Sequence, residues 1–106
     1  MSYDEATVQQ VWERGRASTD FDPAQWRQDQ CGAWLRRDQY GSANGPFAWK
    51  ILPVKPGPGN DVDNLRPFHR ENDFDRALSQ AHCNLTSDRL QAYPTAQMGE
   101  PANRPA

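Results

Sequence analysis

A small α+β domain is the fold class that the sequence predicts, because strand-like runs stand between two segments with helical periodicity. Apolar residues recur at helical spacing in residues 2–15 and again in residues 69–82, which predicts a helix at each position. Residues 31–36 and 49–54 are short, contain Trp, Leu, Ile and Val, and are bounded by turn-forming residues, as strands are. We therefore expect one domain covering residues 1–93.

Two helices are predicted at the N-terminal end. Ser2 with Glu5 three residues later has the pattern of a capping box for the first helix. A second, short helix is expected over residues 22–29, with Asp22 as its cap and a proline in the first helical position. This second helix would turn Trp26 inwards. The buried face of the first helix would hold Val8, Val11 and Trp12.

The C-terminal half is predicted to be helical and to end in a tail. Residues 55–61 are rich in proline and glycine and predict a turn. The longest helix is expected over residues 69–82, and a short one over residues 86–93. Residues 94–106 hold little to bury, so we expect a disordered, flexible tail. The buried stripe of the longest helix would hold Phe74, Ala77, Leu78 and Ala81.

Charge and cysteine content limit the function classes. The formal net charge of -2 argues against tight non-specific binding to phosphate, although a local basic face is compatible with it. The start of the chain is polar and acidic, and no apolar run is long enough to span a membrane, so we expect a cytoplasmic protein. Cys31 and Cys83 are then expected to be two buried free thiols, with a disulfide between them as the alternative.

A series of motifs in fixed order covers residues 11–75. They are Val-Trp-Glu-Arg-Gly-Arg at 11–16, Phe-Asp-Pro at 21–23, Trp-Arg-Gln-Asp-Gln-Cys-Gly-Ala-Trp-Leu-Arg-Arg at 26–37, Tyr-Gly at 40–41, Trp49, and Asn64-Leu65. This order resembles the bacterial HNH endonucleases. The resemblance implies a ββα core at about 49–82, in which Trp49, Asn64 and Leu65 are structural motif residues and Asn64 ties the preceding loop to the backbone.

The departures from that family concern its chemistry. The family strand reads Trp-x-Ile-Asp-His-Ile-x-Pro-Val, whereas residues 49–54 read Trp-Lys-Ile-Leu-Pro-Val, without the Asp-His step. In these nucleases the His activates water and the Asp helps to hold a divalent metal. Leu52 and Pro53 can do neither, and Asp73 stands where His or Asn is usual. We therefore expect an inactive relative that needs no cofactor.

Residual metal binding is the first alternative to be weighed. His69 and Asp73 are four residues apart on the predicted helix, so they would share one face and could hold a divalent cation. In the interpretation that we favour, His69 packs at the start of the helix and the acids are solvated. The acidic neighbours that could join such a site are Asp61, Asp63 and Asp75.

The arginines are the candidates for binding. In an HNH fold, arginines around the last helix hold phosphates, and the same residues can instead pair with the fourteen acidic side chains of this chain. Arg14, Arg16 and Arg27 lie in the lead-in to the motif. The binding candidates are Arg36, Arg37, Arg66, Arg70 and Arg76.

The predicted function is a catalytically inactive, HNH-like binding module, whose partner is DNA or a protein complex that handles DNA or RNA. One alternative is an inhibitor of the phage or mobile-element type, which blocks a protein complex such as a host defence nuclease. Another is a residual metal-dependent DNA endonuclease that uses His69 and Asp73.

Overall fold

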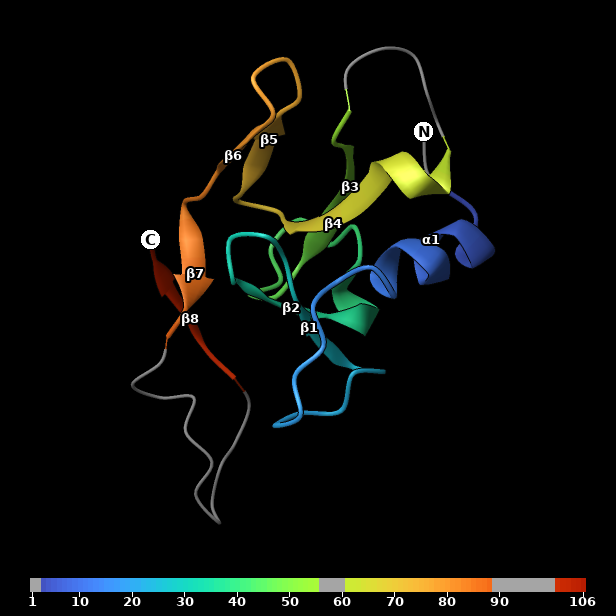
Figure 1. Ribbon diagram of the computed structural model, residues 1–106. Helices are drawn as coiled ribbons and strands as arrows, with labels where there is room; N and C mark the ends of the chain where they lie inside the picture. Colours follow the sequence, from blue (N-terminus) through green and yellow to red (C-terminus); the bar gives the residue numbers. More distant parts are fainter. Residues whose placement is uncertain (1–2, 56–60, 89–100) are drawn as a thin grey trace.

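The computed structural model describes residues 3–55, 61–88 and 101–106, and within them the chain is α+β (Figure 1). One helix, α1 (Glu5–Trp12), accompanies eight short strands that pair antiparallel, two by two. Single turns of 3-10 helix lie at Arg37–Gln39 and Val62–Asn64. The strand pairs are β1 (Trp26–Gln28) with β2 (Trp34–Arg36), β3 (Trp49–Pro53) with β4 (Leu65–His69), β5 (Asp73–Asp75) with β6 (Gln80–His82), and β7 (Leu85–Ser87) with β8 (Asn103–Pro105).

Helix α1 is capped by Asp4, whose Oδ1 accepts a hydrogen bond of 2.8 Å from the Thr7 N–H. This hydrogen bond also holds the pKa of the Asp4 carboxyl below its ordinary value. The capping box expected at Ser2 lies outside the described residues. The predicted buried face of the helix is confirmed by Val8, Val11 and Trp12.

The main core lies where α1 packs against the β3–β4 hairpin (Figure 1). Trp12 from the helix meets Trp49 from β3, with ring centroids 5.2 Å apart, and Tyr40 lies 4.8 Å from the same Trp49 ring. The predicted strand at residues 49–54 is confirmed as β3. The remaining buried members of this core are Val8, Val11, Leu35, Ile51 and Leu65.

The helix predicted over residues 22–29 is wrong. Asp22 does act as a cap, since its Oδ1 accepts from the Ala24 N–H and its carbonyl accepts from the Trp26 N–H, but the turn goes no further. The chain then enters β1, because strand pairing lets the Trp26 ring pack against aromatic neighbours such as Phe47. Trp26 is turned inwards as expected, and its ring meets Phe47 edge-on at 4.9 Å.

The helix predicted over residues 69–82 is also wrong, and the ββα core is not found among the described residues. The region forms the end of β4 and the β5–β6 hairpin. Asp75 Oδ1 accepts from the N–H groups of Ala77 and Leu78, which favours a turn over a continuing helix. Leu78 lies at the tip with 68% of its surface exposed, so the predicted buried stripe does not exist.

The C-terminal end is docked rather than loose. Asn103 uses its side chain as a substitute strand partner for Trp34: its Oδ1 accepts from the Trp34 N–H at 2.7 Å, and its Nδ2 donates to the Trp34 carbonyl at 3.0 Å. Residues 101–106 therefore contradict the predicted flexible tail, and β7 stands where the last helix was to begin. The predictions for residues 89–100 lie outside the described residues.

Cys31 and Cys83 form a disulfide, so the expectation of free thiols is wrong. Their Cα atoms lie 5.4 Å apart, and the bridge joins the β1–β2 loop to the residue after β6. Disulfides persist in oxidising environments, so this bridge does not support the expected cytoplasmic location. Among the described residues, no helix combines the length and the apolar character that crossing a membrane requires.

Replacing both cysteines by serine should lower the free energy of unfolding by about 4 kcal/mol. The reason is that the bridge spans a sequence separation of 52 residues and restricts the unfolded chain accordingly. Urea unfolding of the double variant and of the parent protein measures the difference. The parent protein in reductant is the control, and it should unfold with the double variant; a midpoint that does not move would contradict the prediction.

Candidate functional site

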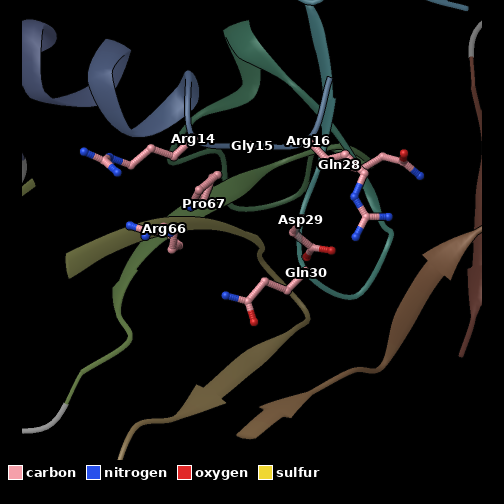
Figure 2. Close-up of a pocket in the computed structure, with 8 residues that line it drawn as sticks. All are labelled: Arg14, Gly15, Arg16, Gln28, Asp29, Gln30, Arg66 and Pro67. Atoms are coloured by element: carbon pink, nitrogen blue, oxygen red, sulfur yellow. The ribbon is translucent and has the colours of Figure 1, made fainter. Parts of the chain in front are cut away.

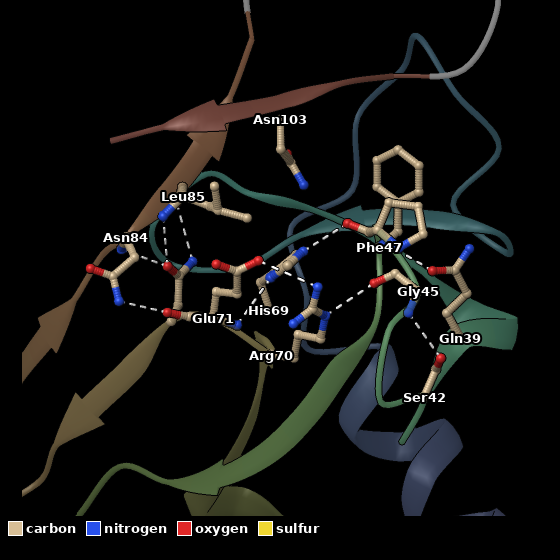
Figure 3. A network of polar contacts seen from close by, with 12 residues as sticks. Gln39, Ser42, Gly45, Phe47, His69, Arg70, Glu71, Asn84, Leu85 and Asn103 are labelled. Carbon is tan, nitrogen blue, oxygen red and sulfur yellow. Dashed lines mark hydrogen bonds and ion pairs between the residues drawn. The ribbon is translucent and has the colours of Figure 1, made fainter.

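The proposed metal ligand His69 is buried, with 0% of its surface exposed. Its Nδ1 accepts from the Glu71 N–H at 3.1 Å, and its Nε2 lies 2.8 Å from the Pro46 carbonyl (Figure 3). These contacts fit a neutral imidazole with its proton on Nε2. Both ring nitrogens are therefore engaged within the protein, and neither offers a free lone pair to a metal.

Asp73 does not join His69 in a site. It starts β5, lies exposed, and pairs with the Lys50 ammonium at 3.1 Å. The two residues do not share a helix face because the chain between them leaves β4 and turns. Among the described residues, no group of three or more His, Cys, Asp or Glu side chains is placed to hold a metal ion.

The three motif residues carry structural contacts. Asn64 is buried and its Oδ1 accepts from the Lys55 N–H at 2.6 Å, while its carbonyl accepts from the Val54 N–H at 2.9 Å. Asn64 thus ties the end of β3 to the start of β4 across the turn-rich connection. Trp49 and Leu65 lie in the main core.

The buried carboxylate of Asp29 is the centre of a polar network that the sequence did not reveal. Its Oδ1 accepts from the N–H groups of Cys31 and Ala33, each at 2.9 Å. Its Oδ2 accepts from the His69 N–H and from the Asn72 Nδ2, again at 2.9 Å. With 3% of its surface exposed, Asp29 has exchanged water for four protein donors.

Asn72 extends this network to a third segment, the start of β7. Its Oδ1 accepts from the N–H groups of Asn84 (2.7 Å) and Leu85 (2.8 Å), and its Nδ2 donates to the Leu85 carbonyl at 3.1 Å as well as to Asp29. Asn72 lies within residues 69–82, which were predicted to be a helix, so nothing in the sequence indicated that it would link three segments.

Two of the five arginine candidates, Arg36 and Arg37, are committed to aromatic rings and acids. Arg36 lies over the Trp26 ring at 5.3 Å and pairs with Asp38 at 3.2 Å. Arg37 pairs with Glu5 at 2.6 Å and contacts the Trp49 ring face at 6.0 Å. These side chains cover the aromatic clusters and pair with acidic residues, as expected if the arginines serve the fold and do not bind phosphate.

The remaining candidates differ from one another. Arg70 donates to the Gly45 carbonyl at 3.2 Å and pairs with Glu71 at 3.4 Å (Figure 3). Arg76 is exposed in the β5–β6 turn, with no side-chain partner in the described part of the chain. Arg66 on β4 lines a cavity together with Arg14 and Arg16.

This cavity, which we call the arginine cleft, has a volume of about 180 Å³ and lies between the segment after α1, β1 and β4 (Figure 2). Arg14 and Arg66 lie on one side of Gly15, and the guanidinium of Arg16 lies on the other, beside Gln28. The residues that line the cleft are Arg14, Gly15, Arg16, Gln28, Asp29, Gln30, Arg66 and Pro67.

Local contacts hold the Arg-Gly-Arg segment in place. Arg27 Nη1 donates to the carbonyls of Glu13 and Gly15, each at 3.0 Å. Arg16 exchanges backbone hydrogen bonds of 2.8 and 2.9 Å with Gln28, so the segment runs along the edge of β1. A Cβ on Gly15 would lie 3.2 Å from both the Trp12 carbonyl and Arg27 Cβ, so this close approach favours glycine.

The cleft brings positive charges together, and Asp29 and Asp63 compensate them in part. Arg14 pairs with the exposed Asp63, but no carboxylate of the described residues pairs with Arg66, which donates to the carbonyls of Asp63 and Leu65 at 2.8 Å. Burial, and then the nearby charge of Arg14, lower the pKa of Arg66. Arg16 has no side-chain partner within residues 3–55, 61–88 and 101–106.

Guanidinium groups in such a cleft suit an anion with several oxygens, such as a phosphate or a phosphodiester. The sequence candidates omitted Arg14 and Arg16, although the Arg-Gly-Arg pattern after a helix was visible. Comparisons with protein-family models, with curated proteins and with solved structures found no match to this chain.

Asn72→Ala should lower the free energy of unfolding by about 2–3 kcal/mol, because it removes a donor from the buried Asp29 carboxylate and leaves the part-buried N–H groups of Asn84 and Leu85 without their acceptor. Chemical denaturation followed by tryptophan fluorescence measures the loss. Asn44→Ala, at an exposed asparagine, is the matched control and should change stability by less than about 0.5 kcal/mol. Equal stability of the two variants would show that the network contributes little.

Proposed function

We propose that this chain is a nucleic-acid-binding module without nuclease chemistry, and that it holds a phosphodiester in the arginine cleft. The observation that carries the proposal is the placement of Arg66 beside Arg14 in one cavity, half-buried and without an ion pair of its own among the described residues. Keeping like charges together is unfavourable in the free protein, and a bound anion removes that cost.

The overall charge makes the expected binding modest. A protein of net charge -2 has no broad basic face, so only the few phosphates at the cleft would be neutralised. Affinity should then fall with salt along a shallow slope. A shallow dependence of affinity on salt is expected when few phosphates are contacted, whereas strongly basic domains contact many phosphates and show a steep one.

The resemblance of residues 11–75 to bacterial HNH endonucleases supports nucleic acid as the ligand class. In that comparison β3 and β4 correspond to the two strands of the motif, whereas β5 and β6 stand where its helix would be. A degenerate, HNH-like origin is accordingly part of our proposal. Loss of catalysis follows from the missing Asp-His step and from the engagement of both His69 nitrogens.

A second candidate function is inhibition of a protein complex by direct contact. It is favoured by the β5–β6 hairpin, which projects from the rest of the fold and exposes Leu78 at its tip (Figure 1). An apolar side chain on a projecting turn suits a pocket on another protein. Binding through this tip would be insensitive to changes in the arginine cleft.

Arg66→Gln and Arg16→Gln should each weaken binding of a fluorescein-labelled oligonucleotide by about 5- to 10-fold, and each should lower the salt slope by about one unit. Fluorescence anisotropy across a salt series measures both effects. Arg76→Gln is the matched control, because Arg76 is exposed far from the cleft in the fold, and it should change affinity by less than about 2-fold. Equal losses in all three variants would refute a specific cleft.

The parent protein should not nick supercoiled plasmid in magnesium, manganese, nickel or zinc, because both ring nitrogens of His69, the single histidine of residues 11–75, are engaged within the protein. Gel electrophoresis of the plasmid after incubation measures nicking. Asp73→Asn serves as the comparison variant, since Asp73 is exposed and its replacement should leave the fold intact. Metal-dependent cleavage that disappears in Asp73→Asn would restore the residual-nuclease alternative.

A further inference from the structure

A second cavity adjoins the arginine cleft, and the two share Arg16, Gln28 and Gln30 as lining residues. Its volume is about 340 Å³. Arg16 lines both hollows, and its guanidinium lies on the far side of Gly15 from Arg14 and Arg66 (Figure 2). We call this second cavity the hydroxyl pocket, after Ser18, Thr86 and Ser87 in its wall.

The chemistry of the hydroxyl pocket differs from that of the cleft. Asp20 supplies an exposed carboxylate, which repels phosphate but accepts hydrogen bonds from the amino groups of bases. Serine and threonine hydroxyls both donate and accept, as sugar hydroxyls and base edges require. The pocket therefore suits the uncharged, hydrogen-bonding part of a nucleotide, whereas the cleft suits its charged part.

Trp34 also lines this pocket, and the residue is almost fully buried, with 4% of its surface exposed. Its Nε1 makes no hydrogen bond with any described residue, but the atom is sealed from solvent and offers no donor to a ligand in the cavity. Recognition in the pocket therefore depends on its exposed polar groups.

The pocket is formed before any ligand arrives. Thr86 Oγ1 donates to the Cys31 carbonyl at 2.8 Å, and the disulfide fixes the same loop to Cys83. Gly32 has a φ of 87°, and a Cβ there would lie 2.9 Å from Thr86 Oγ1, so the loop packs directly on β7. Asn103 holds the backbone of Trp34. A preformed wall loses little conformational freedom on binding.

We infer that the hydroxyl pocket takes the nucleoside next to the phosphate held in the arginine cleft, and that the ligand is consequently single-stranded nucleic acid. A base that is stacked and paired in a duplex cannot enter such a pocket unless it leaves the helix. Single strands offer unpaired bases at no such cost. This inference rests on the proposed function, because it assigns the strand type and the second contact of the same site.

The test compares three fluorescein-labelled ligands of equal length by anisotropy: a single strand, the same strand with abasic residues throughout, and the duplex. The parent protein should bind the single strand about 10-fold more tightly than either of the others. Equal affinity for all three would overturn the nucleoside pocket and leave the phosphodiester cleft standing. Binding of none would overturn both proposals.

Two variants locate the effect in the pocket. Ser87→Tyr fills the cavity from β7, and it should abolish the preference for the natural strand while leaving affinity for the abasic strand unchanged. Asp20→Ala removes the exposed carboxylate that accepts from the amino groups of bases, and it should reduce the preference by about 5-fold. Near-ultraviolet circular dichroism checks that both variants fold. An undiminished preference in both folded variants would refute the assignment.

Discussion

The hydrogen bonds of the buried Asp29 carboxylate are the interaction on which the rest of the structure depends. A carboxylate removed from water is strongly unfavourable unless it is surrounded by donors, and Asp29 receives four of them. Those donors come from its own loop, from the end of β4 and from Asn72, which in turn binds the start of β7. Loss of this centre would leave three segments with unsatisfied polar groups at once.

A polar centre has this importance because the described sheets have only two strands each. An isolated pair of strands is marginal in water, since it has no second layer to cover its apolar face. Among the strand pairs that the structure describes, only the β3–β4 hairpin is covered by a described helix. The other pairs are joined by specific ties, namely the Cys31–Cys83 bridge and the Asn103 side chain on Trp34. Small folds need such ties.

Local signals in the sequence predicted the face of α1, the strand β3 and the inward turn of Trp26, because each depends on neighbouring residues. The helix prediction over residues 69–82 failed because the spacing of its apolar residues fits two structures. Phe74 and Ala81 are seven residues apart, which suits one helix face, but they also lie opposite one another in the β5–β6 register. The contacts that favour the β5–β6 hairpin over a helix involve residues far away in the sequence. Similarly, nothing local places Arg66 beside Arg14, and the role of Asn72 depends on partners many residues away.

The same polar centre also sets the electrostatics of the arginine cleft. Asp29 lines the cleft, but its oxygens are directed to donors of the fold and are not available to neutralise a guanidinium. Its negative charge nevertheless remains nearby and reduces the pull on an incoming phosphate. Arg14 is further moderated by Asp63. Partly compensated arginines should hold the proposed phosphodiester weakly enough to release it, which suits a module that exchanges along a strand more than one that clamps a single phosphate.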